Sequence, residues 1–219
     1  MNLICKIMIA ATLFFLNSTA YSCKAQVSLL NPNDKAFSAS APAVFKVLLE
    51  TTKGNILMEL KREWAPNGVD RFYNLVRYGY YNNAPVFRIR TATWAQFGIA
   101  GDPKIARVWR YKTIPDDPRI EPNVRGTVAY AFKEPNGRTT QVFINLRDNR
   151  STHDKEPFVP FAKVIEGMDV ADALYSEYGE QAGGGIRGGH QDSLFITGND
   201  FLKRKFPKLD YIKQARIIP

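Results

Sequence analysis

The residue types that carry most enzyme chemistry are scarce in this chain of 219 residues, which has two histidines and two cysteines. Cys5 and Cys23 both lie close to the N-terminus, so the rest of the chain has neither a disulfide nor a thiolate nucleophile. His153 and His190 alone, without cysteine, disfavour a metal site built on nitrogen and sulfur ligands.

Two segments match catalytic patterns only formally. Ser151, His153 and Asp154 are the residue types of a catalytic triad, but neighbouring positions rarely give triad geometry. Gly183–Gly188 matches G-x-G-x-x-G, yet it follows a predicted helix instead of a strand, so we interpret it as a surface turn. With no general base, nucleophile or metal centre evident, an enzyme of this kind would act by binding and polarising its substrate.

The remaining candidates are an arginine and two glutamines within aromatic strands. Arg88 stands between two apolar residues in one predicted strand, and Gln96 lies in the next. Gln141 and Phe143 share one face of a third strand, because alternate residues of a strand point the same way. Structural alternatives exist for each: Arg88 would form a surface salt bridge, and the glutamines would pair along an exposed sheet edge.

Short β-prone runs dominate the part of the chain that must position these residues. The predicted strands are 45–51, 55–60, 86–89, 94–99, 126–132, 141–146 and 161–165. Helical spacing is found in two segments, around 69–76 and over Met168–Tyr178. Many short strands with two helices favour a closed or nearly closed β architecture over a doubly wound sheet.

In their order along the chain, these elements resemble the cyclophilins, a family of peptidyl-prolyl cis-trans isomerases. The resemblance runs from about Phe45 to Thr197 and includes Thr51–Ile56, Ala65-Pro66, Phe87-Arg88-Ile89, Gln96-Phe97-Gly98, Thr139–Ile144 and Phe158–Val164. It implies a mainly β fold, an eight-stranded antiparallel closed barrel capped by two α-helices. The tail from Phe201 to Ile212 is similar to a C-terminal extension of a bacterial subgroup.

The resemblance also implies which residues form the active site. It places Arg88 on the catalytic arginine, Gln96 and Gln141 on substrate-binding glutamines, Phe143 on an aromatic of the proline pocket, and Ala131 on a backbone-contacting position of the peptide groove. No cofactor is required for such a reaction.

Three further positions of the expected pocket depart from the family pattern. Thr93 replaces a pocket aromatic, Trp94 stands where a medium-sized apolar residue is usual, and His153 stands where leucine is usual. We therefore expect a pocket that is more polar at Thr93 and His153 and bulkier at Trp94. We therefore expect a lower isomerase activity or a different substrate preference.

The charge balance has a plain interpretation. Lys+Arg 30 against Asp+Glu 21 gives a net charge of +9, but the basic residues are scattered apart from Lys203–Lys205 and Lys208. We interpret them as a solvated basic surface and expect no nucleic-acid partner.

Residues 1–22 are typical of a signal peptide. Lys6 precedes the apolar run Ile7–Leu16, which is too short to span a bilayer. The alternative is a buried N-terminal helix. Two cleavage sites remain open: one after Ala20, and one before Cys23 in a segment that resembles a lipoprotein box, where Cys23 would be lipidated and attach the protein to the membrane.

These observations predict a domain plan and a function. Residues 1–22 form the signal peptide, 23–43 a loose arm, 44–197 the cyclophilin-like domain and 198–219 a short C-terminal appendage. We expect a monomeric periplasmic isomerase that acts on proline-containing peptide segments and assists the folding of exported proteins. The alternative is a non-catalytic peptide-binding chaperone that keeps the groove but has lost turnover through Thr93 and His153.

Overall fold

The computed structural model describes residues 27–182 and 191–218. The predicted signal peptide, Cys23 and the glycine-rich motif at 183–188 therefore lie outside the described residues.

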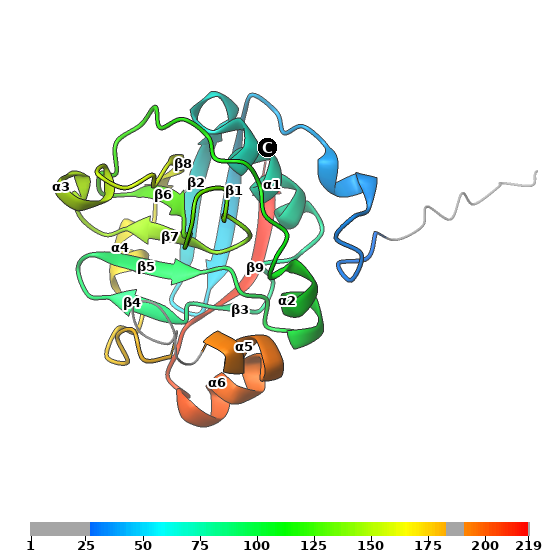
Figure 1. Ribbon diagram of the computed structural model, residues 1–219. Helices are drawn as coiled ribbons and strands as arrows, with labels where there is room; N and C mark the ends of the chain where they lie inside the picture. The colour runs from blue at the N-terminus through cyan, green and yellow to red at the C-terminus, as the bar shows by residue number, and fades with distance from the viewer. Residues whose placement is uncertain (1–26, 183–190, 219) are drawn as a thin grey trace, which may run out of the picture.

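Within the described residues, the strands form one nine-stranded antiparallel sheet that curls on itself (Figure 1). The spatial order is β3-β9-β1-β2-β8-β6-β7-β5-β4. The strands are β1 Val44–Thr51, β2 Asn55–Lys61, β3 Ala84–Pro85, β4 Arg88–Arg90, β5 Trp94–Phe97, β6 Thr127–Tyr130, β7 Val142–Asn145, β8 Pro160–Glu166 and β9 Tyr211–Ile218.

The two end strands of the sheet, β3 and β4, are neighbours in the chain. β3 pairs with β9 and β4 pairs with β5, so the curled sheet brings its two edges onto one stretch of chain. The barrel-like β architecture is thereby confirmed, whereas the expected count of eight strands is wrong because the described residues form nine. This stretch contributes two short strands, β3 and β4, which are separated by the buried Val86 and Phe87.

The sheet encloses an apolar core, and α1 (Pro66–Arg77) packs against β8 and β9 with its buried residues in that core. Alternate residues of β1 and β2 point inward, as the period of two in these strands requires. Pro66 suits the first turn of α1 because that turn has no acceptor for its missing N–H. The Phe72 ring on α1 lies 5.1 Å from the Phe161 ring of β8, centroid to centroid, and so joins the helix to the sheet.

The helices differ from the two that were expected. α1 is confirmed, but the second predicted helix is only α4 (Met168–Asp172). It ends there, and the Tyr175 N–H donates instead to the Asp210 carboxylate at 2.7 Å. Other helices in the described ranges are α2 Pro103–Trp109, α3 Arg150–His153, α5 Gln191–Thr197 and α6 Asn199–Lys205. In that part of the chain, no helix has the length and apolar character needed to cross a bilayer.

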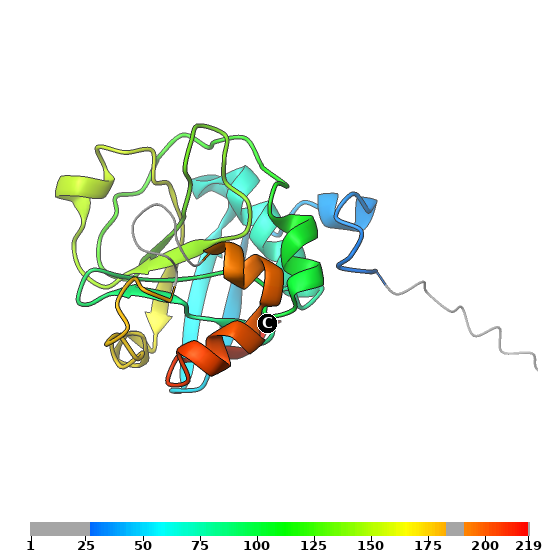
Figure 2. The ribbon, with the colours of Figure 1, turned by 60° about the horizontal axis from the view of Figure 1, so that its bottom comes forward.

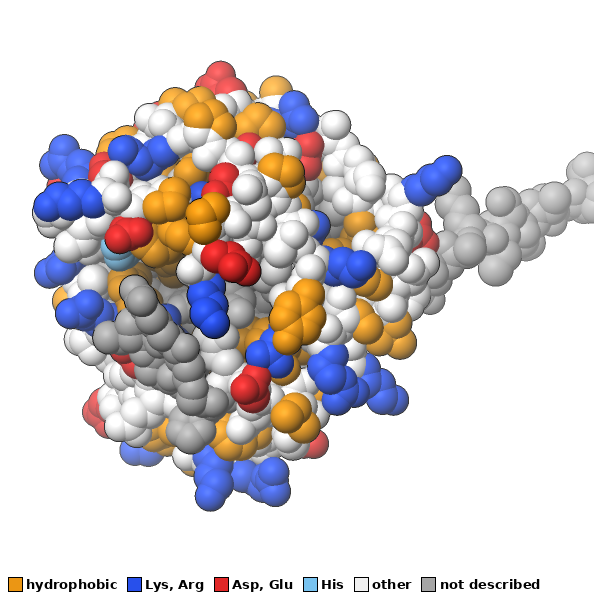
Figure 3. Space-filling view, viewed as in Figure 1, with side chains coloured by type: hydrophobic (Ala, Val, Ile, Leu, Met, Phe, Trp, Pro, Cys, Tyr) orange, Lys and Arg blue, Asp and Glu red, His pale blue; other side chains and the backbone are white. Residues whose placement is uncertain are grey.

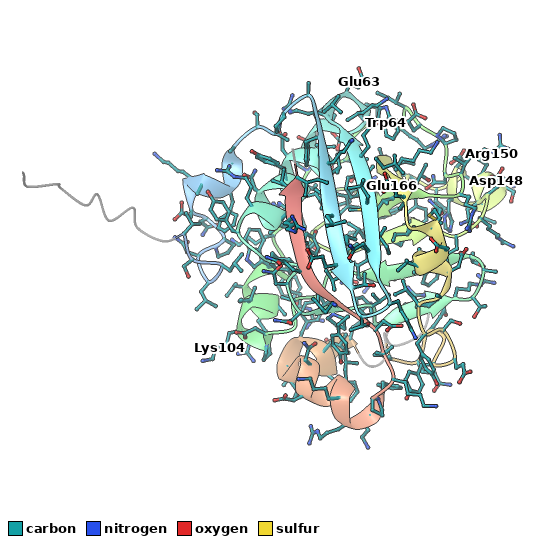
Figure 4. The ribbon with its side chains drawn as sticks, turned by 180° about the vertical axis from the view of Figure 1, so that it is seen from behind. Glu63, Trp64, Lys104, Asp148, Arg150 and Glu166 are labelled. Atoms are coloured by element: carbon teal, nitrogen blue, oxygen red, sulfur yellow. The ribbon has the colours of Figure 1, made fainter. Side chains whose placement is uncertain are left out.

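The C-terminal segment is part of the barrel, so its assignment as an appendage is wrong. β9 lies between β1 and β3 and pairs with β1 over Lys46–Thr51 (Figure 4). Ile212 and Ala215 are buried, which ties this strand to the core. α5 and α6 precede β9 and lie at one end of the barrel next to α2 (Figure 2). The expected boundary after residue 197 therefore falls inside the fold.

The described part of the expected loose arm is packed against the domain. Phe37 makes edge-to-face contacts with Tyr78 and Trp109 at centroid distances of 5.0 and 4.9 Å. The Trp109 Nε1–H donates to the Leu29 carbonyl at 2.8 Å, and the Asn74 amide donates to the Ala39 carbonyl at 2.7 Å. These contacts hold residues 27–43 on α1 and α2, so the prediction of a loose segment is wrong for this part.

Candidate active site

Arg88, Gln96 and Phe143 form a row across three neighbouring strands. In the sheet register, Arg88 of β4 is opposite Gln96 of β5, and Gln96 is opposite Phe143 of β7. Their side chains face away from the core, because the residues that alternate with them are buried core residues, namely Ile89, Ala95 and Ile144. The three strands that carry these residues, β4, β5 and β7, lie side by side in the sheet (Figure 1).

A chain of hydrogen bonds links the arginine to both glutamines. The Arg88 guanidinium donates through Nη1 to Gln96 Oε1 at 3.0 Å, and Gln96 Nε2 donates to Gln141 Oε1 at 2.8 Å. Gln96 is only 4% exposed, so its amide is fixed in one orientation by these two bonds. The glutamines therefore do not pair along an exposed edge; they order the arginine.

Two further groups hold the Arg88 guanidinium. Its central carbon lies 4.6 Å from the centre of the Trp94 ring, and its Nη2 donates to Glu180 Oε1 at 3.2 Å. Nε is buried without a hydrogen-bond partner among the described residues. Burial lowers the pKa of Arg88, and the nearby Glu180 carboxylate opposes that shift. Because the ordinary pKa of arginine is so high, Arg88 stays a cation at neutral pH.

An aromatic cluster lies beside this arrangement. The Phe143 ring makes edge-to-face contacts with His153 of α3 and with Phe158, both at 5.3 Å between centroids, and Phe132 packs on Phe158 at 4.7 Å. Figure 3 shows hydrophobic side chains gathered next to the histidine on this face. Such a cluster offers an apolar surface of the kind that a proline ring packs against.

His153 is held by a buried amide. Its Nδ1 lies 3.2 Å from Asn145 Oδ1, so Nδ1 carries the proton and Nε2 is the free acceptor of the neutral ring. Asn145 Oδ1 also accepts from Asn149 Nδ2 at 2.7 Å, which fixes that oxygen in place. Burial lowers the pKa of His153, so the ring is neutral at pH 7. The sequence predicted a more polar pocket at His153, but the Nδ1 atom of this ring points to the buried Asn145.

Thr93 and Ala131 are each held by hydrogen bonds that involve backbone atoms. Thr93 is buried, its hydroxyl donates to the Thr91 carbonyl at 3.2 Å, and its own carbonyl accepts from Asn149 Nδ2. Thr93 thus anchors the turn between β4 and β5, and its contribution to a pocket stays a prediction. Ala131 follows β6 and donates its N–H to the Gln141 carbonyl at 2.9 Å, which extends the pairing with β7 toward the glutamine.

Sequence reasoning did not assign Glu180 or Phe158 to the site. Glu180 is separated from Arg88 by 92 residues and follows α4 in an irregular segment, so no spacing or periodicity relates the two. Phe158 belongs to a motif that the family resemblance included, but a motif alone does not show which ring it contacts. Only the packing of the loop against Phe143 reveals that role.

Comparison with known proteins identifies the family of this chain. The family model described as cyclophilin type peptidyl-prolyl cis-trans isomerase/CLD matches residues 46–185. Peptidyl-prolyl cis-trans isomerase A of Dickeya dadantii is 30% identical over 182 residues, covering 81% of this chain and 88% of the relative. A probable peptidyl-prolyl cis-trans isomerase of Brucella suis is 32% identical over 142 residues, covering 58% and 70%. The chain therefore belongs to the cyclophilin-type peptidyl-prolyl cis-trans isomerases.

Solved structures show the same fold. A cyclophilin-type isomerase of Cryptosporidium parvum superposes with a TM-score of 0.59 at 19% identity, covering 80% of this chain and 98% of that one. A structure of the same protein in the presence of the dipeptide Ala-Pro gives a TM-score of 0.55 at 21% identity, covering 80% and 99%.

Proposed function

We propose that this protein isomerises X–Pro bonds in exported proteins and that Arg88 is the catalytic residue. The observation that carries the proposal is the placement of Arg88, a cation that is 12% exposed, in one row with Gln96 and the Phe143 aromatic cluster. The geometry thus combines a fixed, charged donor with an apolar surface for a ring.

The chemistry needs no bond to be broken. Rotation about an X–Pro bond interrupts amide resonance and has a barrier of about 18–20 kcal/mol, which makes the uncatalysed exchange slow. In the twisted state the nitrogen becomes pyramidal and its lone pair can accept a hydrogen bond. A donor that prefers this nitrogen to the planar amide lowers the barrier, and each 1.4 kcal/mol or so gives a tenfold rate increase.

The surrounding residues supply the rest of the mechanism. Gln96 and Trp94 hold the guanidinium so that little reorganisation is needed during rotation. The Phe143 cluster would hold the proline ring while the preceding carbonyl turns. Gln141, bonded to Gln96 through its oxygen, would present its amide N–H groups to the peptide backbone.

A non-catalytic peptide-binding chaperone is the second candidate, and the Arg88–Glu180 ion pair favours it, because the pair occupies one donor of the arginine. Magnetisation exchange between the cis and trans forms of a proline peptide separates the two. An isomerase produces exchange that Arg88→Ala removes. A binding protein shifts the peptide signals without producing exchange.

We also propose that the protein acts after export, either free in the periplasm or attached to the membrane through a lipid on Cys23. The signal-like pattern of residues 1–22 and the position of Cys23 at its end support this. The intact mass of the protein isolated from its cell envelope tests the proposal. A mass that corresponds to a chain starting at residue 21 indicates a free protein. A mass that corresponds to a chain starting at a lipidated Cys23 indicates a membrane anchor, and the mass of the uncleaved chain contradicts export.

A further inference from the structure

The carboxylate of Glu180 is built into the site described above. Its Oε1 lies 3.2 Å from Arg88 Nη2, and the two side chains are 23% and 12% exposed. Among the described residues, Glu180 is the carboxylate whose charge and hydrogen bond act on the Arg88 guanidinium. The pair is therefore accessible at its outer edge, on the face where a peptide would lie.

Glu180 is held by its own segment as well as by Arg88. The Gly179 carbonyl accepts the Ile89 N–H of β4 at 3.0 Å, so the segment is bonded to the sheet edge immediately beside Arg88. Ala182, two residues further on, is fully buried. Glu180 thus lies between two anchored residues, and its carboxylate is positioned before any substrate arrives.

The carboxylate changes the charge that a substrate meets. Arg88 and Arg90 together carry two positive charges on β4, and the Glu180 carboxylate offsets the charge of Arg88, with which it forms an ion pair. At the α3 end of the sheet, Asp148 is bonded to Arg150 (Figure 4). Among the described residues, Glu180 is the acidic group that contacts Arg88, so a peptide bound at Arg88 would lie beside its carboxylate.

We propose that Glu180 is a specificity-determining residue, which favours X–Pro segments with lysine or arginine beside the proline and disfavours segments with aspartate or glutamate there. The inference rests on the proposed function, because it takes the peptide to bind at Arg88. A cationic neighbour of the proline is attracted by the Glu180 carboxylate, and an acidic neighbour is repelled. Without this carboxylate, Arg88 and Arg90 would reverse the preference.

Two peptide series test the proposal, one with lysine, alanine or glutamate before the proline and one with the same residues after it. The quantity measured is the ratio of kcat/KM for the lysine peptide to that for the glutamate peptide, at low salt. We expect the wild-type protein to favour lysine, and Glu180→Gln to lower the ratio about fivefold or more in at least one series, as the Coulomb energy over several ångströms near a surface predicts. High salt should shrink the difference.

The ratio separates specificity from a structural role, because a displaced Arg88 would slow both peptides alike. Glu177→Gln is the matched control, since Glu177 lies in the same segment but accepts a hydrogen bond from the Tyr175 hydroxyl. Its ratio should equal that of the wild type, and Glu180→Asp should keep most of the lysine preference. An unchanged ratio in Glu180→Gln, or an equal fall in Glu177→Gln, overturns the proposal.

Dissociation constants for the same peptides, measured by calorimetry, keep the two proposals distinguishable. If the wild type isomerises no peptide, the proposed function fails while the lysine-to-glutamate ratio of affinities still decides the role of Glu180. If it binds none of the peptides, both proposals are overturned.

Discussion

The guanidinium of Arg88 rests on the indole of Trp94, with its central carbon 4.6 Å from the ring centre. The two residues lie diagonally across neighbouring strands, since Arg88 is opposite Gln96 and Trp94 precedes Gln96 by two residues on the same face. The large side chain at position 94, unusual for the expected family pattern, therefore supports the arginine.

Replacement of the indole by an aliphatic side chain tests that support. We expect Trp94→Leu to lower kcat/KM about twofold to thirtyfold, because a cation–π contact that is partly shielded from water contributes about 0.5–2 kcal/mol. The thermal unfolding midpoint should change little, since Trp94 is only partly buried. Trp94→Phe, which keeps a ring, should give an intermediate rate. Equal rates for Trp94→Leu and the wild type would contradict a supporting role.

Gln141 should act through Gln96. In Gln141→Met the chain length is kept but the acceptor for Gln96 Nε2 is lost, so the Gln96 amide is no longer fixed against Arg88. We expect kcat/KM to fall about threefold to tenfold, the effect of one hydrogen bond of about 1 kcal/mol. Steady-state kinetics on a proline peptide measure it. The double variant Gln141→Met with Gln96→Met should lose less transition-state stabilisation, calculated from kcat/KM, than the sum of the losses in the two single variants. Full additivity of these losses would show that the two residues are not coupled.

His153 should make stability depend on pH. Because burial lowers its pKa in the folded state, the folded protein favours the neutral ring. The contribution of His153 to stability is complete above the ordinary pKa of histidine and is lost as the pH falls through the lowered value. Thermal unfolding at about pH 7.5 and about pH 5 should show a smaller loss of stability in His153→Leu than in the wild type. The same loss in both proteins would contradict this assignment.

The N-terminal arm should contribute to stability. Phe37 packs its ring between Tyr78 and Trp109, so Phe37→Ala is expected to lower the free energy of unfolding by about 1–3 kcal/mol, less than for a fully buried phenylalanine. Leu30→Ala is the control, because Leu30 is 52% exposed. Its effect should stay within about 0.5 kcal/mol in denaturant titrations. Equal changes in the free energy of unfolding for Phe37→Ala and Leu30→Ala would contradict a stabilising role of the Phe37 contacts.

Local patterns account for the features that sequence analysis predicted correctly. The alternation of apolar residues reveals the strands, and the order of the motifs along the chain reveals the family. The register of the sheet then places Arg88, Gln96 and Phe143 in one row, while their roles in the site stay predictions.

The incorrect or missing predictions all depend on contacts between distant parts of the chain. The segment that contains β9 looks like an appendage because the need for one more strand between β1 and β3 is not visible in its own residues. Phe37 lies among small and polar residues, which suggest a loose arm until its ring is seen against Trp109. The contact of Glu180 with Arg88 likewise depends on the path of an irregular segment, for which no periodicity exists.

The proposed isomerase activity depends most directly on Arg88, and the rate of cis–trans isomerisation of a proline peptide tests this role. Wild type, Arg88→Ala and Arg88→Lys should be compared at equal concentration, with folding of each confirmed by circular dichroism. We predict acceleration by the wild type, a loss of about a hundredfold in kcat/KM for Arg88→Ala, and little recovery in Arg88→Lys, because lysine lacks the planar fork that Gln96 orders. A wild-type protein at the uncatalysed rate, or an Arg88→Ala variant as active as the wild type, would contradict the catalytic role of Arg88.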